Sequence, residues 1–239
     1  MSVLQIRKII KPIKKYNKCK HCHIANLCLG GHNNNNTKIF QKLKFKAKTL
    51  QPGMHLIRQD EITQNLYAIR TGILKSYVTQ ADGQEYVMSF QIAPELFGWE
   101  NIENKKATMS IVALDYTNVC IIPFSQLAEL IQTAPEIEMQ IFRMVSKSFH
   151  KNNLASIRTS ALQRVANFLL VLSEHSRLLG FPYYLCRLSM THQDIANYLR
   201  IAPETISRTF KNMQQQEIIK ICQKKIYIND FERLQKIAV

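Results

Sequence analysis

The chain has 239 residues, 46% of them hydrophobic and 21% charged, which is the balance of an ordinary globular protein with one large or two modest domains. No apolar run approaches the roughly 18 residues that span a bilayer, and the basic N-terminus lacks the apolar stretch of a secretory signal, so we expect a cytoplasmic protein with no membrane span. The net charge of +15 favours an anionic polymer as partner, with nucleic acid as the first candidate and a merely solvated face as the alternative.

The first notable segment is CKHCHIANLC, residues 19–28, which holds three cysteines. Clustered cysteines in a reducing compartment hold metal more often than disulfides. An iron–sulfur cluster would need a fourth thiolate from elsewhere. Zinc is the alternative, with His32 completing a Cys3His set and His21 or His23 able to serve instead. A polar linker, residues 30–36, separates this segment from the rest.

From about residue 44 to residue 124, short runs of alternating apolar and polar residues are separated by turns. Alternation is typical of half-buried strands, and Asp82-Gly83 between two such runs is a hairpin signal. Several short strands at this spacing predict an antiparallel barrel or jelly roll. Cys120 lies in one of these strands, so its side chain is expected on the face opposite to that of its two apolar neighbours.

The apolar period becomes helical after Pro123. A short helix is predicted first, with Ser125 as its N-cap. A long helix is predicted from about Glu136 to Thr159, with apolar residues on two edges that would pack against the barrel and against a partner helix. Polar residues from His150 to Asn153 interrupt this seam. The predicted homodimer is therefore weak enough to be regulated.

The last third has the pattern of a winged helix-turn-helix. Thr191 and Asp194 are spaced as a capping box at the start of one helix, and Pro203 suits the first turn of the next. The segments IIKIC and IYIND predict the strands of the wing. If the second helix buries Ile206, Phe210 and Met213, its outer face presents Glu204, Ser207, Arg208 and Lys211.

This outer face has the chemistry of a major-groove reader. Arg208 can bond bidentately to guanine, Glu204 can accept from cytosine, and Ser207 is adaptable. Lys211 and the lysines of the wing suit phosphates, which add affinity but little sequence information. A polar helix face that is simply wet is the alternative; the charge, the helix pair and the wing together favour double-stranded DNA.

The order of barrel, long helix and winged helix resembles the CRP/FNR family of bacterial transcription regulators. The motif ETISR, residues 204–208, resembles that family's recognition helix, and an apolar residue before the glutamate is closer to the FNR branch. The resemblance implies an α+β fold with an N-terminal antiparallel β-roll or jelly-roll sensor domain, a long dimerisation helix and a C-terminal winged helix-turn-helix. It also implies a homodimer on an inverted repeat of the form TTGAT…ATCAA.

The resemblance implies a division into four parts: a cysteine-rich segment (1–37), a sensor domain (38–134), a dimerisation helix (135–160) and a DNA-binding domain (161–239). Two positions depart from the family pattern. Arg200 stands where relatives have a turn glycine, and Ala202 where they have a capping Ser or Thr, whose loss costs about 0.5–2 kcal/mol. No arrangement of nucleophile, base and orienting group indicates an enzyme.

The resemblance also bears on the metal. Cys19, Cys22 and Cys28 match the N-terminal cluster motif of the FNR branch, and Cys120 occupies its fourth ligand position, which implies an oxygen-sensing [4Fe–4S] cluster. Zinc at the N-terminal cysteines stays open as the alternative, in a regulator gated by a small organic effector in the barrel.

Three further expectations concern the remaining candidates. No arginine lies between Arg70 and Arg143, where nucleotide-binding members carry one for the cyclic phosphate, which argues against a cyclic nucleotide. Cys186 and Cys222 fit no spacing pattern and are expected to be small buried hydrophobes. RNA polymerase is the expected second partner, and by resemblance it would touch the turn made of Ala81, Asp82, Gly83, Gln84 and Glu85.

Overall fold

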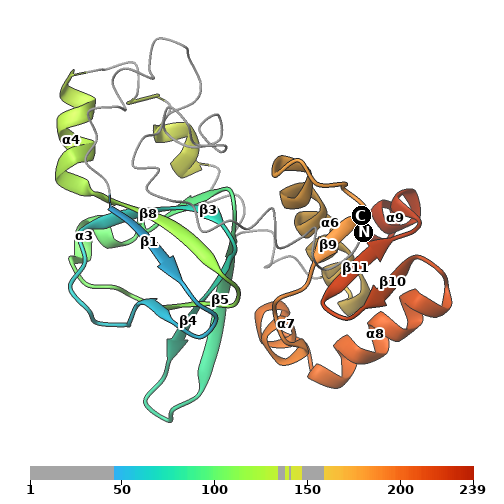
Figure 1. Cartoon of the computed structure of the whole chain (residues 1–239). Coiled ribbons are helices and arrows are strands. Elements are labelled where there is room, and N and C mark those ends of the chain that lie inside the picture. The colour runs from blue at the N-terminus through green and yellow to red at the C-terminus, as the bar shows by residue number, and fades with distance from the viewer. Residues whose placement is uncertain (1–45, 134–137, 140, 147–158) are drawn as a thin grey trace.

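The computed structural model describes residues 46–133, 138–139, 141–146 and 159–239 (Figure 1). The cysteine-rich segment and most of the predicted dimerisation helix lie outside the described residues. The described part of that helix, 138–139 and 141–146, is helical as predicted, whereas Thr159 at its predicted end is not helical.

The N-terminal domain is a roll of two four-stranded antiparallel sheets, so the predicted fold class is confirmed. One sheet has the order β1-β8-β3-β6 and the other the order β2-β7-β4-β5. Side chains such as Leu50, Leu74 and Val119 fill the space between the sheets. The strands are β1 (Lys46–Leu50), β2 (His55–Ile57), β3 (Asn65–Thr71), β4 (Ile73–Thr79), β5 (Glu85–Ile92), β6 (Glu95–Phe97), β7 (Ser110–Ala113) and β8 (Thr117–Pro123).

The hairpin predicted at Asp82-Gly83 joins β4 to β5. Gly83 has φ +82°, a left-handed value that costs glycine little. Its N–H donates to the Gln80 carbonyl at 2.9 Å, and Asp82 closes the turn by accepting from the Gln84 N–H at 2.9 Å. The turn residues are exposed at the tip of the hairpin.

The roll is accompanied by α3 (Asn101–Asn104) and α4 (Phe124–Thr133). Helix α4 begins at Phe124, whose N–H donates to the Gln64 carbonyl at 2.9 Å. Strand β8 therefore runs directly into the helix, and Ser125 lies inside the first turn, so its prediction as the N-cap was wrong. Leu127 and Leu130 of α4 pack on the outer face of the β1-β8-β3-β6 sheet.

The C-terminal domain is the predicted winged helix-turn-helix with two additions, a third strand and a last helix. Its sheet has the order β10-β11-β9. Ile206, Phe210 and Met213 are buried, as predicted. The elements are α6 (Ala161–Leu178), β9 (Leu185–Arg187), α7 (His192–Leu199), α8 (Pro203–Gln215), β10 (Ile219–Cys222), β11 (Lys225–Ile228) and α9 (Phe231–Ala238).

The predicted start of α7 is confirmed, and the turn after it is built without glycine. Thr191 caps α7 and forms a full capping box with Asp194. Arg200 takes the left-handed conformation (φ +56°, ψ +47°) in which glycine is free of steric cost. Arg164 Nη1 donates to the carbonyls of Leu199 at 3.0 Å and of Arg200 at 3.3 Å, which ties this turn to α6.

Helix α7 also docks on the sensor domain of its own chain (Figure 1). The Asn197 amide accepts from the Val87 N–H and donates to the Glu85 carbonyl, both at 2.8 Å. Lys75 Nζ lies 2.9 Å from Asp194 Oδ1, and both side chains are mostly buried. A capping residue of the helix-turn-helix therefore also forms an interdomain ion pair.

Replacing Asp194 with Asn should lower the free energy of unfolding by about 1.5–3 kcal/mol at neutral pH, because it weakens hydrogen bonds to a charged group. Urea unfolding followed by circular dichroism measures this change. Arg177→Gln, which breaks an exposed pair with Glu174, is the control and should have no measurable effect. Equal stability of wild type and Asp194→Asn would show that the Asp194 carboxylate does not stabilise the fold through these contacts.

The Asp194–Lys75 pair also makes the free energy of unfolding depend on pH. Burial alone would raise the pKa of Asp194, but hydrogen bonds from Thr191 and Lys75 and the Lys75 charge outweigh it and lower the pKa below its usual value. The contribution of Asp194 is therefore present above the unfolded pKa of about 4 and is lost as the pH falls through the folded value. We expect the stability difference between wild type and Asp194→Asn to shrink as the pH falls below about 4.

Candidate nucleic-acid interface and metal site

Helix α8 presents the four predicted DNA-contacting residues on its exposed face. Glu204, Ser207, Arg208 and Lys211 are all exposed, and the opposite side of the helix is buried. Ala202 precedes the helix without a side-chain cap, and Pro203 occupies its first turn, as predicted. This arrangement leaves a carboxylate, a hydroxyl, a guanidinium and an ammonium free to meet a groove.

One contact on this face was not predicted. His192, the first residue of α7, places Nδ1 3.3 Å from Ser207 Oγ. Its ring lies edge-on to Phe210, with centroids 5.3 Å apart and planes at 61°. Because His192 directly follows the capping threonine, the sequence places it at the start of α7, but no pattern in the sequence indicates which residue of α8 lies next to it.

The wing is confirmed with shifted limits. Strands β10 and β11 pair from Ile219 to Ile228, and the turn between them is Gln223-Lys224. The second strand stops before Asp230, because Asp230 caps α9 by accepting from the Arg233 N–H at 2.9 Å. Lys224 is exposed at the tip of the wing, where a phosphate contact is geometrically possible.

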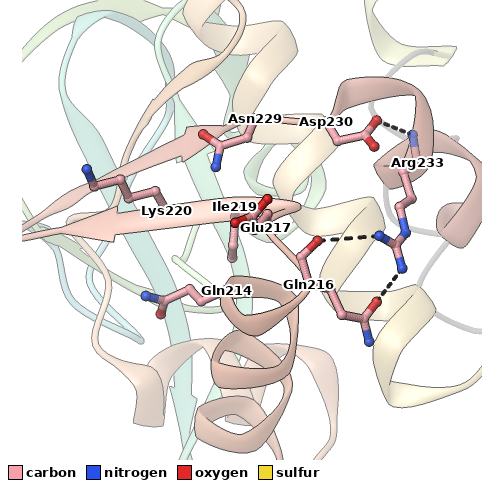
Figure 2. Close-up of a pocket in the computed structure, with 8 residues that line it drawn as sticks. All are labelled: Gln214, Gln216, Glu217, Ile219, Lys220, Asn229, Asp230 and Arg233. Carbon is pink, nitrogen blue, oxygen red and sulfur yellow. Dashed lines mark hydrogen bonds between the residues drawn. The ribbon is translucent and has the colours of Figure 1, made fainter.

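Close to the wing, the end of α8, strand β10 and the start of α9 surround an open polar pocket (Figure 2). Three of its residues, Gln216, Asp230 and Arg233, are already hydrogen-bonded within the fold. Arg233 donates to the Gln216 carbonyl at 3.4 Å and to Gln216 Oε1 at 2.8 Å, and Asp230 caps the helix. These hydrogen bonds join the end of α8 to α9 at the pocket.

Cys120 lies in β8 on the outer face of the β1-β8-β3-β6 sheet, as predicted. Val119 points between the two sheets, whereas Cys120 packs with the cluster under α4 and is half-buried. Its neighbours across the strands are Ala47 of β1 and Ala68 of β3. Ala68 is buried under α4, whereas Ala47 is exposed, so the side of the thiol that faces β1 is the one open to solvent.

The other two described cysteines differ from each other. Cys186 is buried against the Leu169 carbonyl, and burial raises the pKa of its thiol to about 12, so the prediction of an inert core cysteine is confirmed. Cys222 is exposed, so the same prediction for it was wrong. It ends edge strand β10 next to the wing turn, where no element covers it.

The three N-terminal cysteines lie outside the described residues, so their position relative to Cys120 stays a prediction. Within the described ranges, no three side chains of His, Cys, Asp or Glu gather into a possible metal site. In the same ranges, no helix has both the length and the apolar character that a bilayer crossing requires.

Comparisons with known proteins agree with this architecture. Residues 47–134 match the model of a cyclic nucleotide-binding domain, and residues 163–237 match that of a Crp-like helix-turn-helix domain. The transcriptional activator protein Anr of Pseudomonas protegens is 34% identical over 89% of this chain and 88% of its own length. The fumarate and nitrate reduction regulatory protein of Yersinia pestis is 32% identical over 92% of this chain and 90% of its own.

Among solved structures, FixK2 from Bradyrhizobium japonicum superposes with a TM-score of 0.73 over 82% of this chain and 98% of its own. At 21% identity, this similarity concerns the fold alone.

Arg208→Ala should cost about 1–3 kcal/mol on a cognate operator and relax the preference at the base pair that Arg208 contacts. Lys211→Ala should weaken binding to all duplexes about equally and reduce the slope of log affinity against log salt by about one. Fluorescence anisotropy with matched and altered duplexes measures both. Gln215→Ala, an exposed change at the far end of α8, is the control. A uniform loss for Arg208→Ala would reassign it to a phosphate.

Proposed function

Because the chain belongs to the CRP/FNR family of helix-turn-helix transcription regulators, which are not enzymes, we propose that it senses oxygen or redox state through a [4Fe–4S] cluster. In this proposal it acts in the cytoplasm as a homodimer, binds a palindromic operator while the cluster is intact, and activates transcription. The names of relatives as anaerobic and as fumarate and nitrate reduction regulators support the oxygen response.

The environment of Cys120 is the observation that carries the proposal. A fourth thiolate is needed beside Cys19, Cys22 and Cys28, and Cys120 is half-buried on the outer face of its sheet, next to the exposed Ala47. Cys28 lies 19 positions before Ala47, the neighbour of Cys120. An extended chain covers at most about 3.3–3.6 Å per residue, so this linker is long enough to bring the N-terminal cysteines to the sheet.

When bound, the cluster supplies an oxygen-labile link between the N-terminal segment and the roll. The four thiolates would hold it, and the exposed Ala47 beside Cys120 is the side from which the N-terminal segment would approach. Cysteine side chains alone provide the ligands in this proposal, and the histidines of the N-terminal segment have no ligand role.

The packing around Cys120 connects the proposed cluster to the proposed dimer. Cys120 belongs to the same apolar cluster as Ile141 and Val145, which lie in the described part of the predicted dimerisation helix. On that helix Met139 and Phe142, three positions apart and so on one edge, are each 59% exposed, and together they offer an apolar surface to a partner helix. In this proposal a bound cluster biases the position of the helix through the shared apolar cluster.

The hairpin turn from Ala81 to Glu85 remains the proposed contact for RNA polymerase. Glu85 is already engaged, because its carbonyl accepts from Asn197 and its carboxylate lies 3.4 Å from Lys75 Nζ. The exposed tip, residues 81–84, is therefore the part that can meet a partner.

Anaerobic purification should yield protein with about four iron and four sulfide per chain and with visible absorption of thiolate-to-iron bands that is lost in air. Iron and sulfide analysis and absorption spectroscopy measure this. Stoichiometric zinc without visible absorption would overturn the cluster and favour the effector-gated alternative.

Replacing Cys120 with Ser should abolish cluster retention and anaerobic operator binding together, because a hydroxyl is a poor ligand for the cluster. Cys222→Ser is the matched control, since Cys222 is exposed on the wing and should be dispensable for the cluster. Full cluster occupancy in Cys120→Ser would remove this residue from the ligand set.

Ala81→Arg should reduce activated transcription in vitro several-fold while operator binding is unchanged, because a long charged side chain at the tip would obstruct a partner. Ile62→Arg, at another exposed position of the roll (81% exposed), is the control. Unchanged activation in Ala81→Arg would remove the hairpin tip from the polymerase contact.

A further inference from the structure

We propose that His192 is a specificity-determining positioning residue, which orients the Ser207 hydroxyl and so selects the bases that Ser207 can recognise. The proposal rests on the proposed role of Ser207 in reading the operator. It starts from the 3.3 Å contact between His192 Nδ1 and Ser207 Oγ, which links the first helix of the helix-turn-helix to the outer face of the second.

The imidazole of His192 is held from two sides. The capping box of Thr191 and Asp194 fixes the backbone at the start of α7: the Asp194 N–H donates to Thr191 Oγ1 at 3.0 Å, and the Thr191 N–H donates to Asp194 Oδ2 at 3.3 Å. The ring then lies edge-on to Phe210, which is buried. The side chain is exposed, and its contacts with Ser207 and Phe210 both lie on α8.

The hydrogen-bond inventory of serine explains how such a contact selects bases. A free hydroxyl has one donor and two acceptor lone pairs and can rotate to suit any base edge. If His192 Nδ1 accepts, Ser207 gives its only proton to the imidazole and offers lone pairs to the DNA, which suits the amino groups of adenine and cytosine. If Nδ1 donates, Ser207 keeps its proton for the acceptors of guanine or thymine. In the first case Ser207 can only accept from the DNA, whereas in the second it keeps its proton and one lone pair; in both cases the contact fixes the direction in which the hydroxyl points.

Two variants of His192 distinguish the contribution of the Nδ1 atom from that of the aromatic ring. His192→Phe keeps an aromatic ring against Phe210 but removes Nδ1. His192→Asn removes the ring but keeps a polar atom close to the position of Nδ1. These variants, Ser207→Ala and the double variant His192→Phe/Ser207→Ala are made in the full chain. Each is measured on duplexes in which every base pair of the TTGAT half-site is changed in turn.

We expect His192→Phe and Ser207→Ala to change the preference at the same base pair, each by about two- to tenfold, the range for one hydrogen bond. The double variant should show no larger change than Ser207→Ala alone, because both substitutions remove one interaction. His192→Asn should keep most of the preference.

Three results would overturn the proposal. A loss in His192→Phe that is equal on all duplexes would make His192 a phosphate contact. A changed preference in Ser207→Ala but not in His192→Phe would leave the reading by Ser207 intact and remove the role of His192. Unchanged preference in Ser207→Ala would show that Ser207 does not read bases, and the role of His192 would fail with it.

Discussion

The docking of Asn197 on the free edge of strand β5 is the hydrogen-bonded contact that sets the position of α7, and with it of α8, against the roll. An edge strand leaves backbone N–H and C=O groups unpaired. The Asn197 amide pairs with one of each, at 2.8 Å to the Val87 N–H and 2.8 Å to the Glu85 carbonyl. Because it has two hydrogen bonds, this contact fixes both the position of α7 along strand β5 and the rotation of the helix about its own axis. Because α8 follows α7 after a tight turn, the placement of its outer face is set by the same contact.

Apolar packing makes this contact part of one continuous core. Phe90 of β5 lies edge-on to Tyr198 of α7, with ring centroids 5.1 Å apart, and 6.0 Å from Phe168 of α6. Ile73 and Val87 of the roll belong to the same buried cluster. Separating the sensor domain from the DNA-binding domain would expose these side chains to water, which costs free energy in proportion to the apolar area. Each domain therefore restrains the position of the other, and a movement of β5 in the roll would shift α7 and α8.

The sequence was informative where local patterns decide the structure. Alternation predicted the strands, the spacing of Thr191 and Asp194 predicted the start of α7, and apolar period predicted the outer face of α8. Contacts that join distant segments, such as Asn197 with β5 or His192 with Ser207, have no local pattern and were not predicted. Strand β9 has three residues, too few to show a period. Cys222 is exposed because it lies two residues after the exposed Lys220, on the face of β10 opposite to the buried Ile219.

The proposed cluster ligand and the contact with the DNA-binding domain lie on different sheets of the roll. The outer face of β1-β8-β3-β6 carries Cys120, whereas the edge of β2-β7-β4-β5 meets α7. The chain crosses from the first sheet to the second at Gly72, between Thr71 and Ile73. Gly72 has φ +95°, and a Cβ there would overlap the Thr117 side chain of β8. Thr117 Oγ1 donates to the Asp115 carbonyl at 2.9 Å and lies 3.3 Å from the Ile73 carbonyl. Thr117 lies three residues before Cys120, and Ile73 lies in the core shared with the DNA-binding domain, so this closely packed crossover lies between the proposed cluster ligand and that core.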